Sequence, residues 1–252
     1  MKTGILIIAR LGSTRLPQKH LVSVKNRTFI EWLVKRYLHQ FESNIKANEV
    51  KIIIATSVLE ENKLFEEIFK DTSVEVFYGS DRNIPLRQLQ CASKFSLDQI
   101  ISIDGDDVLC STEVAKKIFS ILNNGESAVK SEGLPLGMNV IGYKADYLEK
   151  CLDKELKNST IETGWGRIFD DNLKSINVGG FTFSDKLRFT LDYQVDADFF
   201  ANIINYFDEL IIKLSDSDLI EYVVNNNIFE INSSVHDIYW DNFNNFKQKE
   251  IE

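Results

Sequence analysis

The sequence has few of the residues that mark specialised classes of protein. Among 252 residues only 3 are cysteines, and Cys91, Cys110 and Cys151 form no Cys-x-x-Cys pair. This spacing fits neither a disulfide framework nor a zinc site, so we expect reduced, structural thiols. Proline (3) and glycine (12) are also scarce, while 44% of the residues are hydrophobic, which excludes a disordered chain and predicts a folded globular protein.

Positive charge and long apolar runs are lacking as well. The chain has 29 Lys and Arg residues against 38 Asp and Glu residues, a net charge of −9. A protein that mainly binds nucleic-acid backbones needs a basic surface, so we expect no nucleic-acid partner. The N-terminal apolar run ends at Arg10 after a few residues and is too short for a signal peptide or a membrane span. These absences predict a soluble, cytoplasmic protein without a membrane partner.

Buried strands and amphipathic helices alternate over the first part of the chain. The apolar runs that predict strands cover residues 4–9, 50–56, 74–78 and 99–104. The helical patterns cover residues 29–41, 60–69, 85–95 and 112–122. Strands separated by helices form right-handed βαβ units, so the predicted fold is α/β with a mostly parallel sheet.

The second half of the chain is less regular. We expect loops over 133–137 and 160–166, strands over 138–143 and 187–192, and helices over 146–156, 195–206 and 216–226. Because no repeat or long linker occurs, we predict a single domain with a nucleotide-type half (1–125), an elaborated half (126–240) and a tail (241–252). The tail is polar from Asn242 onwards, and we expect it to fray.

The segment that follows the first predicted strand carries the strongest chemical signal. Residues 9–19 read Ala-Arg-Leu-Gly-Ser-Thr-Arg-Leu-Pro-Gln-Lys, and this loop lies beyond the carboxyl end of a strand, where parallel sheets bind ligands. Arg10, Arg15 and Lys19 place three cations within ten residues, which indicates a polyanion such as a triphosphate. A solvated basic loop is the alternative, while the Walker A and Gly-x-Gly-x-x-Gly patterns do not fit.

Small residues of the same loop support a ligand-binding role. Gly12 allows close approach of a ligand to the backbone, and Ser13 and Thr14 supply hydroxyl and N–H groups.

Three carboxylates lie at the end of another predicted strand. Asp104, Asp106 and Asp107 repel one another unless a cation lies among them, and Gly105 permits a turn between them. An acidic cap on the strand is the alternative interpretation.

The pattern Ala-Arg-x-Gly-Ser-x-Arg-Leu-Pro-x-Lys over residues 9–19 resembles the N-terminal signature of the sugar-acid cytidylyltransferases. The most similar branch comprises the spore-coat polysaccharide biosynthesis and acylneuraminate cytidylyltransferase-like proteins, which are related to 3-deoxy-manno-octulosonate cytidylyltransferase. The resemblance implies a glycosyltransferase-A-like, Rossmann-related three-layer sandwich. It also implies a Mg²⁺-dependent homodimer that transfers CMP from CTP to an anionic sugar or sugar acid, releases pyrophosphate and serves surface polysaccharide or glycan biosynthesis. Residues 126–240 would then form the acceptor and dimerisation half.

Two further segments are similar to the family's metal-binding motifs. Residues 105–109, Gly-Asp-Asp-Val-Leu, resemble Gly-Asp-x-Pro-Leu, whose aspartate ligates Mg²⁺, and that position is Asp106. Residues 188–196 resemble Arg-x-Thr-Val-Asp-x-Pro-Glu-Asp, which makes Asp192 the second metal ligand. We expect Asp196 to act as a helix N-cap rather than in catalysis.

Arg188 is expected to form ion pairs with the aspartates of its own segment, Asp192 and Asp196.

A fourth segment, residues 78–87, is similar to Gly-Ser-x-x-Asp-Val-Leu-x-Arg. It retains Gly79, Ser80 and Arg87 and departs from the pattern at Arg82, Asn83 and Pro85.

The resemblance assigns a role to each of these residues. Arg15 and Lys19 would hold the β- and γ-phosphates and Arg10 would lie near the α-phosphate, so these three form the catalytic set. The nucleotide-binding set is Ala9, Arg10, Gly12, Ser13, Arg15, Lys19, Gly79, Ser80, Arg87 and Asp104. Arg82, Arg87 and Arg167 leave cations near the expected pocket, which favours an anionic acceptor.

The aromatic and histidine residues are less informative. The family often has a Glu-His segment where this chain has Glu162-Thr-Gly-Trp-Gly166, so Trp165 can stack on a ligand, fill a subunit interface or belong to the core. Trp32 and Trp240 are predicted core residues. The histidines His20, His39 and His236 have no supporting cluster, and we assign them no function.

Other functions fit parts of the pattern. A nucleotidyltransferase could use another nucleotide or a phosphate or phosphonate acceptor, and a degenerate homologue could bind a nucleotide without turnover. A glycosyltransferase could use Asp104-Gly-Asp106 as its Asp-x-Asp motif. The retained basic loop and Asp106 argue against a degenerate homologue. The basic loop, which suits a triphosphate that leaves as pyrophosphate, argues against a glycosyltransferase.

Overall fold

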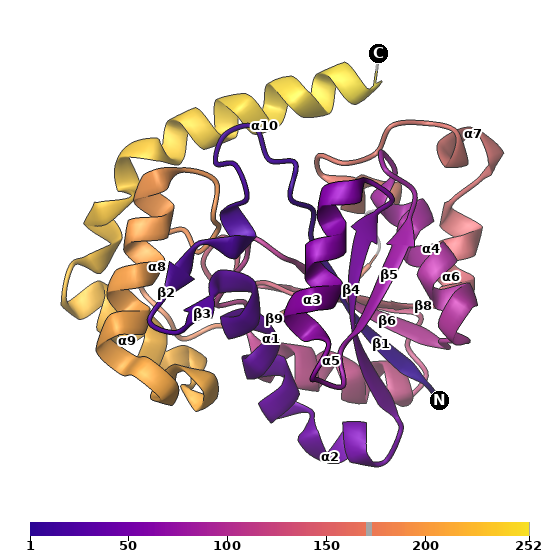
Figure 1. The fold of residues 1–252 in the computed structure, drawn as a ribbon, viewed down its shortest axis with the longest axis horizontal. Helices are drawn as coiled ribbons and strands as arrows, with labels where there is room; N and C mark the ends of the chain where they lie inside the picture. The colour runs from indigo at the N-terminus through magenta and orange to yellow at the C-terminus, as the bar shows by residue number, and fades with distance from the viewer. Residues whose placement is uncertain (170–172, 252) are drawn as a thin grey trace.

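The computed structural model describes residues 1–169 and 173–251, which fold around a central sheet with helices on both faces (Figure 1). The strands of this sheet in spatial order are β5 (Glu75–Gly79), β4 (Val50–Ser57), β1 (Thr3–Ile8), β6 (Gln99–Asp104), β8 (Ile141–Lys144), β7 (Ala128–Glu132) and β9 (Lys174–Asn177). Strand β8 runs antiparallel to β6 and β7, whereas the other neighbours pair in parallel. The predicted α/β fold with a mostly parallel sheet is therefore confirmed.

Helices and short elements complete the fold. The helices are α1 (Phe29–Gln40), α2 (Glu42–Lys46), α3 (Leu64–Phe69), α4 (Ile84–Phe95), α5 (Thr112–Asn123), α6 (Ala145–Cys151), α7 (Lys154–Lys157), α8 (Gln194–Phe207), α9 (Asp216–Asn225) and α10 (His236–Ile251). A separate ribbon pairs β2 (Ser23–Val24) with β3 (Arg27–Thr28). No helix in the described ranges is both long and apolar enough to cross a membrane.

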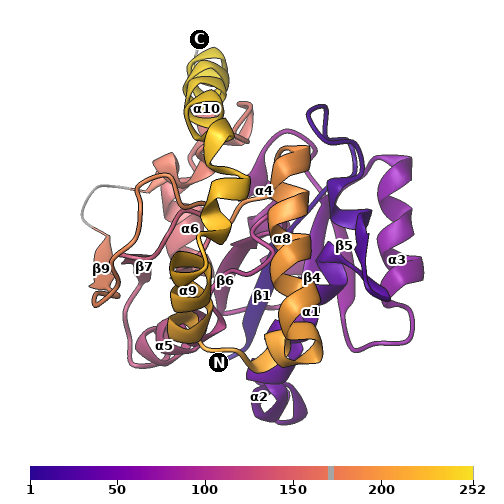
Figure 2. The same cartoon turned by 90° about the vertical axis from the view of Figure 1, so that its left-hand side faces the viewer.

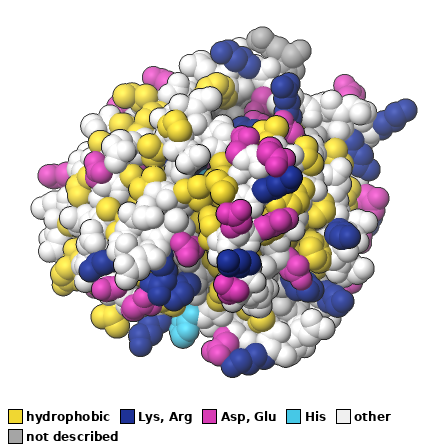
Figure 3. Space-filling model, viewed as in Figure 1, with side chains coloured by type: hydrophobic (Ala, Val, Ile, Leu, Met, Phe, Trp, Pro, Cys, Tyr) yellow, Lys and Arg dark blue, Asp and Glu magenta, His cyan; other side chains and the backbone are white. Residues whose placement is uncertain are grey.

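The core lies on both faces of the sheet because every residue of β1 is buried. The side chains of β1 alternate between the two faces of the sheet. Ile5 and Ile7 pack with α1, α5, α8 and α9, whereas Leu6 and Ile8 pack with α4 and α6. Figure 2 shows α8 and α9 in front of the sheet. On the face shown in Figure 3, acidic and basic side chains are mixed rather than gathered into a basic surface.

Local signals set the starts of the helices in the first half. The Thr28 hydroxyl accepts the Glu31 N–H, and the Glu31 carboxylate accepts the Thr28 N–H, a capping box that begins α1. Asn83 caps α4 by accepting the Leu86 N–H at 2.9 Å, with Pro85 in the first turn. These elements lie within a few residues of the predicted bounds.

The second half departs from the predictions in several elements. The predicted helix over 146–156 is wrong as one element, because the chain leaves helical geometry at Leu152 and Asp153 caps a new helix, α7. The strand expected over 138–143 begins only at Ile141. Strands β7 and β9 were not predicted, because neither segment has a continuous apolar run.

The strand predicted over 187–192 is also wrong. The segment is buried, but its N–H groups bond to loops instead of a neighbouring strand: Phe189 N donates to Leu136 O at 2.7 Å and Leu191 N to Asp106 O at 2.9 Å. Apolar alternation predicts burial of such a segment, but it cannot specify which backbone will accept its hydrogen bonds.

The C-terminal tail does not fray as predicted. Residues 242–251 continue α10, which crosses above the N-terminal loop in Figure 1. Trp240 lies on this helix and is 38% exposed, so its predicted core position is wrong, whereas Trp32 is fully buried as predicted.

Gly137 allows the 187–192 segment to lie close to the loop before β8, so a side chain at this position should destabilise the fold. Its φ is +86°, and a Cβ there would lie 2.3 Å from Phe189 O, so Gly137→Ala should reduce the free energy of unfolding by about 3 kcal/mol. Gly125→Ala is the control, because Gly125 also has a positive φ (+111°) but open space around it. Urea denaturation measures both, and equal losses would contradict the close approach.

Candidate active site

A cleft of about 690 Å³ opens at the carboxyl ends of β1 and β6. Its walls come from the N-terminal loop, the end of β6, the start of α4, two loops of the second half and α10. The residues that line it are Ile8, Ala9, Arg10, Gly12–Arg15, Lys19, His20, Ile84, Arg87, Asp104, Asp106, Asp107, Leu136, Glu162–Gly166, Thr190, Asp192, Tyr239, Phe243, Phe246 and Glu250. This is the edge of the sheet at which a parallel α/β fold is expected to bind its ligand.

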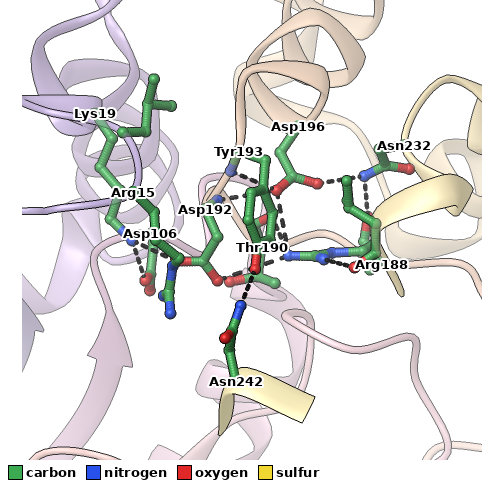
Figure 4. A network of polar contacts seen from close by, with 12 residues as sticks. Arg15, Lys19, Asp106, Arg188, Thr190, Asp192, Tyr193, Asp196, Asn232 and Asn242 are labelled. Atoms are coloured by element: carbon green, nitrogen blue, oxygen red, sulfur yellow. Dashed lines mark hydrogen bonds and ion pairs between the residues drawn. The ribbon is translucent and has the colours of Figure 1, made fainter. Parts of the chain in front are cut away.

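Lys19 lies at the centre of the charged part of the cleft (Figure 4). Its Nζ is 2.6 Å from Asp106 Oδ2 and 3.0 Å from Asp192 Oδ1, and Arg15 Nη2 is 2.5 Å from the same Asp192 oxygen. Burial lowers the pKa of Lys19, but the two carboxylates outweigh it and raise that pKa overall. Burial raises the pKa of Asp192, but Lys19 and Arg15 outweigh it and hold that pKa low.

Asp192 is fixed from behind by a buried network (Figure 4). The N–H groups of Asp192 and Tyr193 donate to Asp196 Oδ2 at 3.0 and 2.9 Å. Arg188 Nη2 lies 3.2 Å from the same oxygen and 3.6 Å from Asp192 Oδ2, while Asn232 donates to Asp196 Oδ1 at 2.9 Å. The predicted ion pairing of Arg188 is confirmed.

The structural role expected for Asp196 is found, but the N-cap assignment is wrong. Tyr193 is the N-cap of α8 and Asp196 lies one turn inside, where its carboxylate accepts the backbone N–H of the cap.

The acidic cluster at the end of β6 is stabilised in two ways. Asp106 pairs with Lys19, so the cation expected among these carboxylates is supplied by a lysine of the chain. Burial, aided by the charge of Asp106, raises the pKa of Asp104 to about 7 and that of Asp107 well above its ordinary value. Among the described residues, no group of three or more Asp, Glu, His or Cys residues is placed to hold a metal ion.

Trp165 belongs both to the cleft wall and to the core. It is 7% exposed, packs edge-on against Tyr143 and Phe169, and donates from Nε1 to Asp104 Oδ1 at 3.2 Å. His20 is a cleft residue that sequence reasoning missed. Its ring is buried, and its Nδ1 lies 3.1 Å from Gly105 O. Burial and the nearby charge of Lys19 lower the pKa of His20 to about 4.

Arg10 is bound to the loop that carries Trp165. Its guanidinium makes two bonds to the Glu162 carboxylate, 2.6 and 2.9 Å long. The N–H groups of Glu162 and Thr163 in turn donate to Glu250 on α10. The C-terminal helix therefore positions the partner of a cation in the N-terminal loop.

The 78–87 segment contributes less to the cleft than the sequence suggests. Arg87 reaches the cleft lining but is 2% exposed, and it donates to Ser80 O and Asp81 O, both at 2.8 Å, and to Ala55 O. Burial and the nearby Arg10 lower its pKa to about 10. Gly79 and Ser80 are not among the described residues that line the cleft, so their role in nucleotide binding stays a prediction.

Sequence reasoning also missed the contribution of α10. Tyr239, Phe243, Phe246 and Glu250 face the cleft, and their spacing of four, three and four residues is the helical signal that identifies them. The abundance of Asn, Lys and Gln between them obscured this signal.

The fold and site together define a nucleotidyltransferase: a mostly parallel α/β sheet with a cationic loop and paired carboxylates at the ends of its central strands. Residues 4–235 match the model of the cytidylyltransferase family. The chain belongs to this family, and the family expected from the motifs is confirmed.

Two of the three relatives described next carry the name of a cytidylyltransferase. An uncharacterized protein of Methanocaldococcus jannaschii is 27% identical over 241 residues, 93% of this chain and 96% of that protein. The 3-deoxy-manno-octulosonate cytidylyltransferase of Coxiella burnetii is 27% identical over 135 residues, about half of each chain (50% and 49%). A cytidylyltransferase from Leptospira borgpetersenii superposes with a TM-score of 0.76 at 25% identity, covering 92% of this chain and 97% of that one.

Asp104 provides a test of the electrostatics of the site. Because its pKa is raised from 3.8 to about 7 in the folded state, the stability that depends on its proton is present below pH 3.8 and is lost as the pH rises through 7. Asp104→Asn carries no such proton, so its free energy of unfolding should increase relative to wild type between pH 5 and 8. Urea denaturation in metal-free buffer measures this difference. The exposed Asp71→Asn is the control, and a pH-independent difference for Asp104→Asn would contradict the raised pKa.

Proposed function

We propose that this chain transfers CMP from CTP to an anionic sugar or sugar-acid acceptor, releases pyrophosphate and serves surface polysaccharide or glycan biosynthesis. The observation that carries this proposal is the convergence of Arg15, Lys19, Asp106 and Asp192 at the ends of the central strands. Family membership supports CTP as the donor. The sugar acid in the name of the Coxiella relative supports the class of acceptor.

Asp106 and Asp192 fit Mg²⁺, because oxygens of both carboxylates already converge on one cation, Lys19 Nζ. Mg²⁺ bound with nucleotides takes one or two carboxylates and completes its shell with phosphate oxygens and water. When bound, the ion would neutralise phosphate charge and polarise the phosphoryl group that is attacked. We therefore propose these two residues as its protein ligands.

The cations of the N-terminal loop would bind the triphosphate. Arg15 and Lys19 would hold the β- and γ-phosphates and stabilise the departing pyrophosphate, with Arg10 near the α-phosphate. An oxygen of the acceptor attacks the α-phosphorus in line as the bond to the pyrophosphate oxygen breaks. This chemistry depends on position and charge neutralisation more than on a protein nucleophile.

The three arginines expected to bind the acceptor are not free to do so from the cleft. Arg82 is exposed and absent from the described cleft lining, Arg87 donates to backbone carbonyls, and Arg167 pairs with Glu250 at 2.9 Å. Arg10 also pairs with a carboxylate, that of Glu162, but its side chain is 40% exposed. We propose that Arg10 is the cation that meets the acid group of the acceptor. The same residue would lie near the α-phosphate, so it could contact both the donor and the acceptor.

Pyrophosphate release tests the donor and the acceptor together. Each of the four NTPs is combined with Mg²⁺ and 3-deoxy-manno-octulosonate, N-acetylneuraminate, a sugar 1-phosphate, a phosphonate or a neutral free sugar. We expect release only with CTP and only with acidic acceptors, because a neutral sugar would leave the cations of the site unpaired. Preferential use of another NTP, turnover with neutral sugars alone, or glycosyl transfer from a sugar nucleotide would overturn the proposal.

The carboxylate assignment is tested by Asp106→Asn. Loss of a metal ligand removes charge stabilisation worth several kcal/mol, so turnover should fall by about two orders of magnitude or more. Asp146→Asn is the control, because Asp146 is an exposed aspartate that pairs with Lys150 on the surface of α6. Thermal unfolding checks that both variants fold, and near-normal turnover by a folded Asp106→Asn would contradict the assignment.

A further inference from the structure

Helix α10 presents an aromatic face to the cleft. Tyr239, Phe243, Phe246 and Glu250 follow one another at helical spacing and all four line the cleft, whereas Ile238 lies on another side of the helix and is 51% exposed. The match to the cytidylyltransferase family ends at Val235, one residue before α10 begins. This wall therefore lies outside the part of the chain that matches the family.

Contacts at both ends fix the orientation of this face. Near its start, the Tyr239 ring lies 4.5 Å from the Arg188 guanidinium, and Asn242 donates to Tyr193 Oη at 2.9 Å (Figure 4). Near its end, Glu250 accepts the Thr163 N–H at 2.9 Å and pairs with Arg167. The two phenylalanines between these contacts are thus held toward the cleft.

The chemistry of this wall differs from that of the opposite one. The N-terminal loop supplies Arg10, Arg15 and Lys19, whereas the α10 side supplies aromatic carbon and one carboxylate, Glu250, which is already paired. Phe246 is 44% exposed at the cleft, so its ring has a surface that a ligand can cover. Such a surface suits the apolar side of a ligand and gives a triphosphate no favourable contact.

We propose that Phe243 and Phe246 form the acceptor-side wall and pack against the C–H face of the acceptor's sugar ring. This inference rests on the proposed cytidylyl transfer and narrows its substrate class. The acceptor is an amphipathic sugar acid, with its acid group toward Arg10 and an apolar ring face or apolar substituent toward α10. The two phenylalanines determine acceptor specificity and take no part in the chemical step.

Phe243→Ala and Phe246→Ala test the inference, with Ile238→Ala as a matched apolar truncation elsewhere on the helix. Pyrophosphate release is measured with CTP and the most active sugar acid of the panel above, and CTP binding is measured by calorimetry without acceptor. Each phenylalanine variant should raise the KM of the acceptor about tenfold through lost aromatic contact, with CTP affinity within about twofold of wild type. Phe246→Tyr keeps the ring and should restore the acceptor KM, and Ile238→Ala should match wild type.

The outcomes separate this inference from the function on which it rests. An active wild type whose Phe243 and Phe246 variants behave like Ile238→Ala, or weaken CTP as much as the acceptor, overturns the inference alone. Failure of the wild type to release pyrophosphate from CTP with any acceptor overturns both. Because Phe246 is 44% exposed, its truncation leaves the folded core intact, and thermal unfolding verifies this for each variant.

Discussion

The whole site depends on the buried ammonium of Lys19, which is held between Asp106 and Asp192. A buried charge is tolerated only when it is paired, so the N-terminal loop, the end of β6 and the segment before α8 must come together in one arrangement. The two carboxylates that we propose as Mg²⁺ ligands are therefore held in place by a cation of the chain itself.

Two further sets of contacts fix the segments that surround Lys19, namely the backbone at Asp192 and the loop that carries Glu162. Arg188 and Asp196, both fully buried, fix the backbone at Asp192, which no neighbouring strand supports. On the other side, Glu250 of α10 holds the loop whose Glu162 pairs with Arg10. The proposed nucleotide side is thus built from residues within the family match, whereas the proposed acceptor side includes a helix beyond it. Such a division would allow the acceptor to vary while the reaction is retained.

Much of the first half was predictable because its signals are local. Continuous apolar runs identified β1, β4 and β6, and the basic loop after β1 was located by its position beyond a strand. The predictions failed where a local pattern has more than one solution. Residues 187–192 alternate like a strand but bond to loops, and one aspartate, Asp153, divides a predicted helix in two. The aromatic spacing of α10 was present in the sequence but hidden among polar residues.

The sequence by itself determined the α/β fold, the cationic loop and the carboxylates, because each depends on residue type and on spacing within a short segment. Only the tertiary structure decided the partners of these residues. Lys19 pairs with Asp106 and Asp192, Arg87 donates to backbone carbonyls, and α10 lines the cleft. Pairing of charges depends on distances between residues that are far apart in the chain. Periodicity describes a segment and its buried face, but it carries no information about which distant group will meet that face.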